Sequence, residues 1–101
     1  MATSKEYIEY VCGQIKGESN VRYKKMFGDY MVYVDEKPLL LVCDNTVFVK
    51  ILPALDDILS KAEKGYPYGG AKEHYIIDPD DENFNDIIAV LKQIIPAKKK
   101  R

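Results

Sequence analysis

The sequence has few of the residues that build metal centres and disulfide scaffolds, with one histidine and two cysteines among 101 residues. A protein zinc site normally takes four ligands, often cysteines or histidines paired at short spacing, whereas His74, Cys12 and Cys43 are widely separated. We therefore predict no zinc site and no cofactor. Both cysteines lie in apolar patterns, which favours reduced, buried thiols; a single disulfide is the alternative.

The chain also lacks an excess of either charge and any long apolar run. Asp and Glu number 16 and Lys and Arg 15, which gives a formal net charge of −1. The chain as a whole therefore lacks the excess of basic residues that is typical of a nucleic-acid-binding domain. The longest apolar run, Pro38 to Cys43, is far shorter than the roughly 20 residues that span a bilayer. The N-terminus "MATSKEYIEY" has no apolar signal core. These absences predict a cytoplasmic protein without a membrane partner.

The remaining composition is that of an ordinary folded domain. Hydrophobic residues make up 47% of the chain and charged residues 31%, a balance that argues against disorder. A chain of this length fits one compact domain. We expect that domain to cover residues 1–96, and residues 97–101 to form a solvated basic tail.

An N-terminal helix is predicted by a capping pattern followed by helical periodicity. Thr3 and Glu6 have the spacing of a capping box, which satisfies free N–H groups at a helix start. We expect the helix to run from about Ser4 to Lys16. Its apolar stripe comprises Ile8, Val11, Cys12 and Ile15.

Short apolar segments between tight turns predict an antiparallel meander from Val21 onward. The expected turns are Gly28-Asp29, Asp35 to Pro38, and Asp44 to Thr46. The expected strands are Val21–Met26, Tyr30–Val34, Leu39–Cys43 and Val47–Leu52, with a short fifth strand at His74–Ile77.

Two more helices are expected beside the fifth strand. Pro53 suits the first turn of a helix that ends at Gly65. Apolar residues recur at helical spacing from Phe84 to Ile95, after acidic residues that favour a helix N-terminus. The predicted fold class is therefore α+β: an antiparallel sheet of about five strands with an N-terminal, a middle and a C-terminal helix.

Two of the expected strands are apolar on both faces. "LLLVC" at residues 39–43 and "YMVYV" at residues 30–34 contain no charged residue, so both faces of these strands require cover. Either the helices divide between the two faces of the sheet, or one face meets a second subunit. This pattern gives the hypothesis of a homodimer.

His74 is the only histidine, and no Ser or Cys motif accompanies it. A general base needs a partner at hydrogen-bond distance and usually a nucleophile, so we interpret His74 as a structural or surface residue. The alternative is a pocket near His74 and Tyr68, which would make the protein a small-ligand binder or an enzyme.

Two other polar segments lack the spacing of known ion sites. Gly69-Gly70 and Lys72 do not form the phosphate-binding P-loop pattern and precede a strand, so we interpret them as a loop. The acidic residues Asp78, Asp80, Asp81 and Glu82 lack the spacing of an EF-hand, which favours a solvated helix cap. We predict no catalytic residues, no metal and no enzymatic activity.

A short basic strand is the first candidate contact surface. Its mixture of basic residues with Tyr23 is typical of surfaces that bind single-stranded nucleic acid, and the tail "KKKR" could add phosphate contacts. The alternative is an edge strand that lysines protect from aggregation. The candidate residues are Arg22, Lys24 and Lys25.

A pair of loop aromatics is the second candidate. Tyr66 and Tyr68 flank Pro67, and half-exposed aromatic residues of this kind are enriched at protein interfaces. Packing over the edge of the sheet is an equally good interpretation.

The segment "RYKKMFGDYMVYVDEKPLLLVCDNTVFVK" resembles the N-terminal domain of the TfoX/Sxy family. In that family a basic strand leads into Met-Phe-Gly, an aromatic-rich strand, an Asp-Gly-Lys-Pro-like turn, an apolar strand, and an Asp-containing turn before a strand that ends in Lys. A weaker resemblance extends over residues 6–95. The matching residues, to which the resemblance gives a structural role, are Met26, Phe27, Gly28, Tyr30, Tyr33, Asp35, Lys37, Pro38, Val42, Asp44, Phe48 and Lys50.

The resemblance implies an α+β domain with helices flanking an antiparallel sheet, and it implies no catalytic residues. For the full-length competence regulators it implies a cytoplasmic role in turning on DNA-uptake genes with a transcription activator. We expect that role to carry over poorly, because 101 residues leave no room for their C-terminal domain. The leading hypothesis is a small regulatory module that acts by protein–protein contact with an unidentified protein partner. A nucleic-acid-associated transcriptional regulator is the second.

The best-matching hairpin gives three structural expectations. Glu36 and Asp29 stand where the family commonly has glycine, so we expect different turn types, since positive φ is harder for Glu. Met26 and Phe27 should fill the core of the sheet. Tyr30 and Tyr33 should take opposite faces or flank a bulge, because odd spacing along a strand alternates faces.

Overall fold

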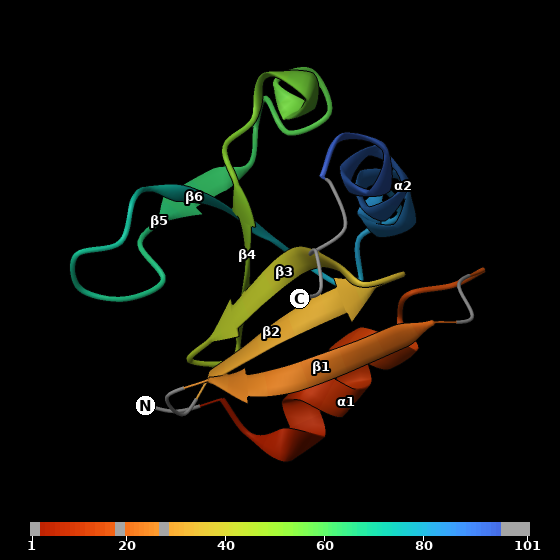
Figure 1. Cartoon of the computed structure of the whole chain (residues 1–101). Coiled ribbons are helices and arrows are strands. Elements are labelled where there is room, and N and C mark those ends of the chain that lie inside the picture. The colour runs from red at the N-terminus through yellow and green to blue at the C-terminus, as the bar shows by residue number, and fades with distance from the viewer. Residues whose placement is uncertain (1–2, 18–19, 27–28, 96–101) are drawn as a thin grey trace, which may run out of the picture.

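The computed structural model describes residues 3–17, 20–26 and 29–95, and it confirms an α+β fold with an antiparallel sheet (Figure 1). Six strands, not five, form one sheet in the order β1-β2-β3-β4-β6-β5, and all neighbouring strands are antiparallel. The elements are α1 (Lys5–Gly13), β1 (Val21–Met26), β2 (Asp29–Val34), β3 (Lys37–Cys43), β4 (Thr46–Lys50), the 3-10 turn η1 (Pro53–Leu55), β5 (Glu63–Gly65), β6 (His74–Ile77) and α2 (Phe84–Ile94).

Two-residue turns with left-handed backbone join the central strands. Asp35-Glu36 connects β2 to β3 with φ values of 52° and 66°, and Asp44-Asn45 connects β3 to β4 with φ values of 51° and 54°. Positive φ at both central residues is the signature of the type I′ turn, whose twist matches that of the flanking strands. The expectation that Glu36 would change the turn type is therefore wrong: the hairpin geometry holds Glu36 in the left-handed region.

The first helix begins one residue later than the capping box predicts. The Oγ of Ser4, not of Thr3, accepts a hydrogen bond from the Tyr7 amide at 3.1 Å, as N-cap residues do. Thr3 is buried, and its hydroxyl donates to the Val42 carbonyl at 3.1 Å and accepts from the Asn45 amide at 3.2 Å. The predicted end at Lys16 is also wrong, because α1 ends at Gly13.

The predicted middle helix is wrong. Only the three residues of η1 are helical, and turns follow them as far as Lys61. Leu55 and Leu59 are nevertheless buried in the core, and the Leu59 amide donates to the Leu55 carbonyl at 2.8 Å. The apolar spacing thus reports the two core contacts correctly, but the chain leaves the helical path to form the unpredicted strand β5.

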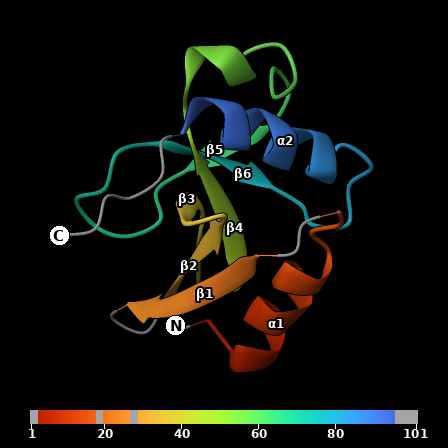
Figure 2. The ribbon, with the colours of Figure 1, turned by 45° about the vertical axis from the view of Figure 1, so that its right-hand side comes forward.

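Both helices pack on the same face of the sheet, as Figures 1 and 2 show. The side chains from that face and from the helices form one core, so the helices do not divide between the two faces. The fully buried members of that core include Ile8 and Val11 of α1, Phe84, Ile87 and Leu91 of α2, and Val32, Val34, Leu40, Val42 and Val47 of the strands.

The opposite face of the sheet receives neither helix, and we call it the helix-free face. Its side chains follow from the strand register, because alternate residues of a strand point to opposite faces. One row of cross-strand partners crosses all six strands: Lys24, Met31, Leu41, Phe48, Ile76 and Glu63.

Substitution of Glu36 measures the strain in the β2–β3 turn. Glu36→Ala and Glu36→Gly both remove the carboxylate, but only glycine adopts positive φ without a steric penalty. We expect the glycine variant to be more stable than the alanine variant by about 1 kcal/mol in urea unfolding. Equal stabilities would contradict a strained left-handed residue at this position.

Candidate functional site

Strand β1 forms one edge of the sheet, and no other strand pairs with its outer side in the part of the chain that the structure describes. The Asp35 amide donates to the Asn20 carbonyl at 2.9 Å, which extends the β1–β2 ladder by one bonded pair. Because bonded and non-bonded pairs alternate in an antiparallel ladder, the backbone groups of Val21, Tyr23 and Lys25 point away from β2. Figure 1 shows this edge at the front of the molecule.

Arg22 is bound by the neighbouring turn. Its guanidinium donates to the two carboxylate oxygens of Glu36 at 2.9 and 3.2 Å and lies 4.5 Å from the centre of the Tyr33 ring. The hydrogen bond to Glu36 raises the pKa of Arg22 further above its ordinary value. The first of the three predicted basic residues is thus neutralised within the hairpin.

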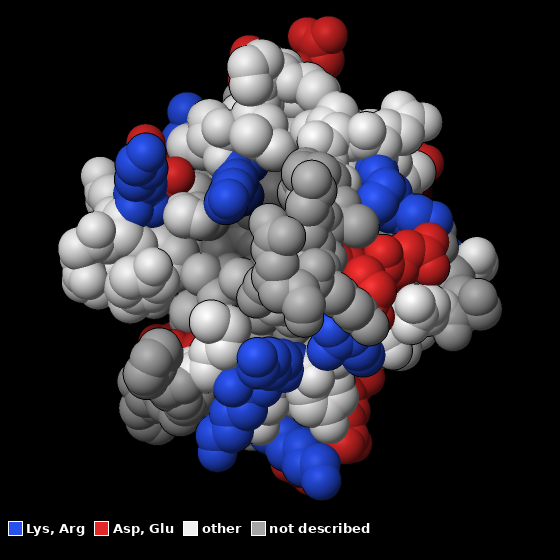
Figure 3. Space-filling model, in the orientation of Figure 1, with Lys and Arg blue, Asp and Glu red and all other residues white. Residues whose placement is uncertain are grey.

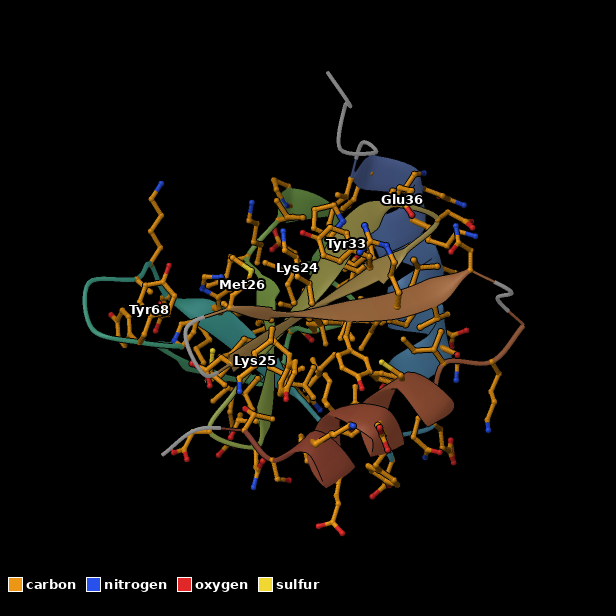
Figure 4. All side chains as sticks on the ribbon, turned by 60° about the horizontal axis from the view of Figure 1, so that its bottom comes forward. Lys24, Lys25, Met26, Tyr33, Glu36 and Tyr68 are labelled. Atoms are coloured by element: carbon orange, nitrogen blue, oxygen red, sulfur yellow. The ribbon has the colours of Figure 1, made fainter. Side chains whose placement is uncertain are left out.

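Lys24 and Lys25 are both exposed and form no ion pair with any residue in the described ranges. They are adjacent, so they point to opposite faces of the sheet (Figure 4), Lys24 on the helix-free face and Lys25 toward α1. Met26 is 37% exposed beside them. The prediction that Met26 fills the core is therefore wrong, and its companion Phe27 lies outside the described residues.

Tyr23 points toward α1, on the face opposite to Lys24. Its ring packs edge-on against Tyr30, with centroids 5.3 Å apart, and its hydroxyl donates to Glu9 at 3.3 Å. Burial, and then Glu9, raises the pKa of the Tyr23 hydroxyl. The aromatic residue of the basic strand is therefore a core contact and does not present a flat ring to a nucleobase.

Tyr30 and Tyr33 lie on opposite faces of the sheet, as their spacing predicts. Tyr30 belongs to the core beside the helices, and Tyr33 lies under Arg22 on the other face. The register between β2 and β3 also shifts between Val32 and Tyr33. Both alternatives that the spacing allowed are thus present in the same hairpin.

The helix-free face is apolar through its middle. Met31, Leu41 and Ile76 are partly exposed there, while Phe48 is buried. A Cβ at Gly65 would lie 3.0 Å from the Cδ1 of Ile76, so glycine leaves room for Ile76 to pack across β5. The face thus presents adjoining aliphatic side chains from three strands.

His74 lies at the start of β6, on this same face. Its Nδ1 is 2.7 Å from the Lys72 carbonyl oxygen, a contact in which the ring N–H donates. Its ring stands nearly perpendicular to that of Phe48, with centroids 6.4 Å apart. These two contacts, to a backbone carbonyl and to an aromatic ring, supply no proton-transfer partner.

The larger cavity lies elsewhere. It has a volume of about 670 Å³, and Tyr7, Lys61 and Asp78 are among the residues that line it. Neither His74 nor Tyr68 lines it, so this cavity is not the pocket on which the ligand-binding alternative depends.

The described residues include no group of three or more histidine, cysteine or acidic side chains arranged to hold a metal ion. Both cysteines are free thiols, Cys43 buried and Cys12 partly buried. Burial, and then Glu9, raises the pKa of Cys12 to about 11, while burial, and then Asp29, raises that of Cys43 to about 12. Thiols with such pKa values are protonated at neutral pH and are weak nucleophiles.

The two aromatic candidates lie apart from the basic strand. Tyr66 is 65% exposed and Tyr68 59% exposed, and they follow β5 at the opposite edge of the sheet. Figure 4 shows Tyr68 on a loop, whereas Lys24 and Lys25 project from β1. The sequence-predicted contact residues therefore do not form a single site.

Several residues of the hairpin motif have structural contacts. Asp35 forms an ion pair with Lys92 at 3.0 Å, and the Lys37 ammonium donates to the Lys92 carbonyl at 2.6 Å. Both contacts tie the β2–β3 turn to the last turn of α2, where a cation also stabilises the helix dipole. Pro38 pairs with Tyr33 in the ladder and Lys50 is exposed at the end of β4, while Gly28 lies outside the described residues.

Sequence comparison finds a relative of this chain in a spirochaete. The chain is 36% identical over 104 residues to an uncharacterised 12.7 kDa protein in the trpE 5′ region of Spirochaeta aurantia. The match covers all of this chain and 90% of that protein. No family model matches the chain. No helix among the described residues has the length and apolar character needed to span a membrane.

The raised thiol pKa values predict an unusual pH profile for alkylation. Below its pKa a thiol gains about tenfold in thiolate per pH unit, whereas an ordinary cysteine levels off above about 8.5. We expect the iodoacetamide rate of the folded protein, followed by intact mass, to keep rising between pH 9 and 10. The urea-unfolded chain is the control and should level off; a plateau in the folded protein would contradict the raised pKa values.

Proposed function

We propose that this protein is a small, non-enzymatic regulatory module that acts by protein–protein contact in the cytoplasm. The chain belongs to the same family as the uncharacterised 12.7 kDa protein of Spirochaeta aurantia, and the proposal rests on the surface of this chain. The observation that carries this proposal is the helix-free face. One complete face of the six-stranded sheet receives neither helix and presents aliphatic side chains at its middle. Apolar surface rimmed by polar residues is typical of protein interfaces.

The partner proposed for this face is a second copy of the chain. The row of cross-strand partners begins with Lys24 and ends with Glu63, with apolar residues between them. A two-fold axis that lies between the faces and parallel to the strands places Lys24 of one copy opposite Glu63 of the other. Symmetric dimers use such self-complementary surfaces, so the charge order of the row favours pairing.

The remaining polar groups support a non-enzymatic role. His74 is bound to a backbone carbonyl, and the two thiols are held in their protonated form. The larger cavity has no histidine or cysteine in its lining. A catalyst needs a base, a nucleophile or a metal within reach of one substrate, and neither the histidine nor the two thiols line this cavity.

The sequence resemblance to the TfoX/Sxy N-terminal domain contributes the regulatory part of the proposal. A role in competence is not included. The nucleic-acid alternative has weaker support, because Arg22 is paired with Glu36 and Tyr23 is turned into the core. Single-strand binding surfaces combine free basic groups with exposed aromatic rings.

Light scattering tests the self-association. At tens of micromolar we expect the mass of a dimer, and we expect Leu41→Glu to weaken dimer formation at least about tenfold, because it buries a carboxylate in the apolar row. Tyr10→Glu is the matched control, since Tyr10 is an exposed residue on α1, away from this face. A monomeric mass for the unmodified chain would refute the second-copy interface.

A charge-exchange cycle tests the geometry of the proposed dimer. Lys24→Glu and Glu63→Lys should each weaken dimerisation by about two- to fivefold, as surface ion pairs do, and the double exchange should restore it. Sedimentation at several protein concentrations gives the dissociation constants of the unmodified chain, the two single variants and the double variant. Additive losses in the double variant would show that Lys24 and Glu63 do not meet across the interface.

A further inference from the structure

The outer side of β1 is a backbone surface ready to pair with another strand. The N–H and C=O groups of Val21, Tyr23 and Lys25 point away from β2, and none of them bonds to another segment within the described ranges. Six consecutive residues pair with β2 without a register shift, so the edge is regular and long enough to pair with another strand. Unpaired edges of this kind accept added strands unless something blocks them.

The charge on this edge is positive on both faces. Lys24 lies on the helix-free face and Lys25 on the α1 face, and neither has an ion-pair partner in the described part of the chain. Figure 3 shows basic side chains gathered over β1. Two successive residues of an added strand also point to opposite faces, so neighbouring carboxylates could each meet one lysine.

The same lysines oppose pairing of β1 with a second β1. An antiparallel pair centred on Tyr23 would place Arg22 opposite Lys24, and a pair centred on Lys24 would place two lysines opposite each other. Like charges directly opposite in a sheet are destabilising. The second copy proposed above therefore suits the helix-free face, and the edge needs a different partner.

We propose that β1 binds an extended acidic segment of a partner protein, which adds to the sheet as a further strand. The backbone of the segment bonds to Val21, Tyr23 and Lys25, and adjacent Asp or Glu side chains pair with Lys24 and Lys25. The inference rests on the proposed protein-contact function; it uses the edge of the sheet, which shares Lys24 with the dimer surface.

Fluorescence anisotropy with a labelled peptide of about ten residues tests this proposal. The probe carries β-branched residues around a central Asp-Glu pair, and a matched peptide carries Lys-Lys at the centre. We expect the full chain to bind the acidic probe and not the basic one. Lys24→Glu combined with Lys25→Glu should weaken the acidic probe at least about tenfold, as loss of complementary charge does. Lys50→Glu with Lys61→Glu, exposed lysines outside β1, is the charge-matched control.

A proline substitution separates strand addition from simple charge attraction. The Lys25 N–H points away from β2, so Lys25→Pro removes an outward donor without breaking the internal ladder. Lys25→Ala removes the same charge and keeps the N–H. We expect the proline variant to bind at least about threefold more weakly than the alanine variant, a difference typical of one lost hydrogen bond. Circular dichroism checks that both variants fold.

Three results would overturn the proposal. They are no binding of the acidic probe at low salt, equal affinities for Lys25→Pro and Lys25→Ala, and tighter binding of single-stranded oligothymidylate than of the acidic peptide. The last result would favour the nucleic-acid alternative. A dimer by light scattering without peptide binding would overturn this inference and leave the proposed function standing.

Discussion

The two left-handed turns set the register on which the rest of the sheet depends. Asp35-Glu36 and Asp44-Asn45 each leave two residues between paired strands, and positive φ at all four positions gives type I′ turns, whose twist matches that of the strands. Since side chains alternate along a strand, a slip of one residue would exchange the two faces of the sheet. Met31 and Leu41 would then point at the helices, and Val32 and Val42 would leave the core.

The same turns also anchor both helices. Asn45 accepts a hydrogen bond from the Ser4 amide at 3.0 Å, at the start of α1. Asp35 pairs with Lys92 in the last turn of α2. Each helix is therefore fixed at one end to a hairpin turn, and these anchors add to apolar packing in holding α1 and α2 on the same face. Because both helices are held on one face, the opposite face of the sheet receives neither of them.

The local sequence pattern correctly predicted the elements whose conformation is determined by their own residues. All five predicted strands were found from short apolar segments between turn residues, and α2 from its apolar spacing, because those signals agree with the tertiary contacts. The middle helix failed because Leu55 and Leu59 have helical spacing while the chain between them and β5 forms turns. The N-cap failed because Thr3 forms hydrogen bonds to a distant strand that local sequence does not reveal.

The sequence predicted which basic residues lie on the candidate surface. It did not predict which residues they contact. Lys24 and Lys25 are exposed, as a basic edge strand suggests. The pairing of Arg22 with Glu36 depends on the hairpin register, which brings together residues separated in the sequence. The inward direction of Tyr23 depends on which face receives α1. The position of the helix-free face also depends on which face of the sheet receives the helices. The apolar residues of the sequence do not indicate which face that is.

The ion pair at the start of β1 gives the edge a direction. Glu36 neutralises Arg22 at one end of the strand, while Lys24 and Lys25 remain charged toward the other. Electrostatic potential therefore changes along the strand axis, and a chain lying beside it would distinguish its own N-terminal and C-terminal halves. The Glu36 carboxylate thus makes the two ends of the β1 edge differ in charge. Parallel and antiparallel alignments of one acidic sequence along this edge therefore differ in energy.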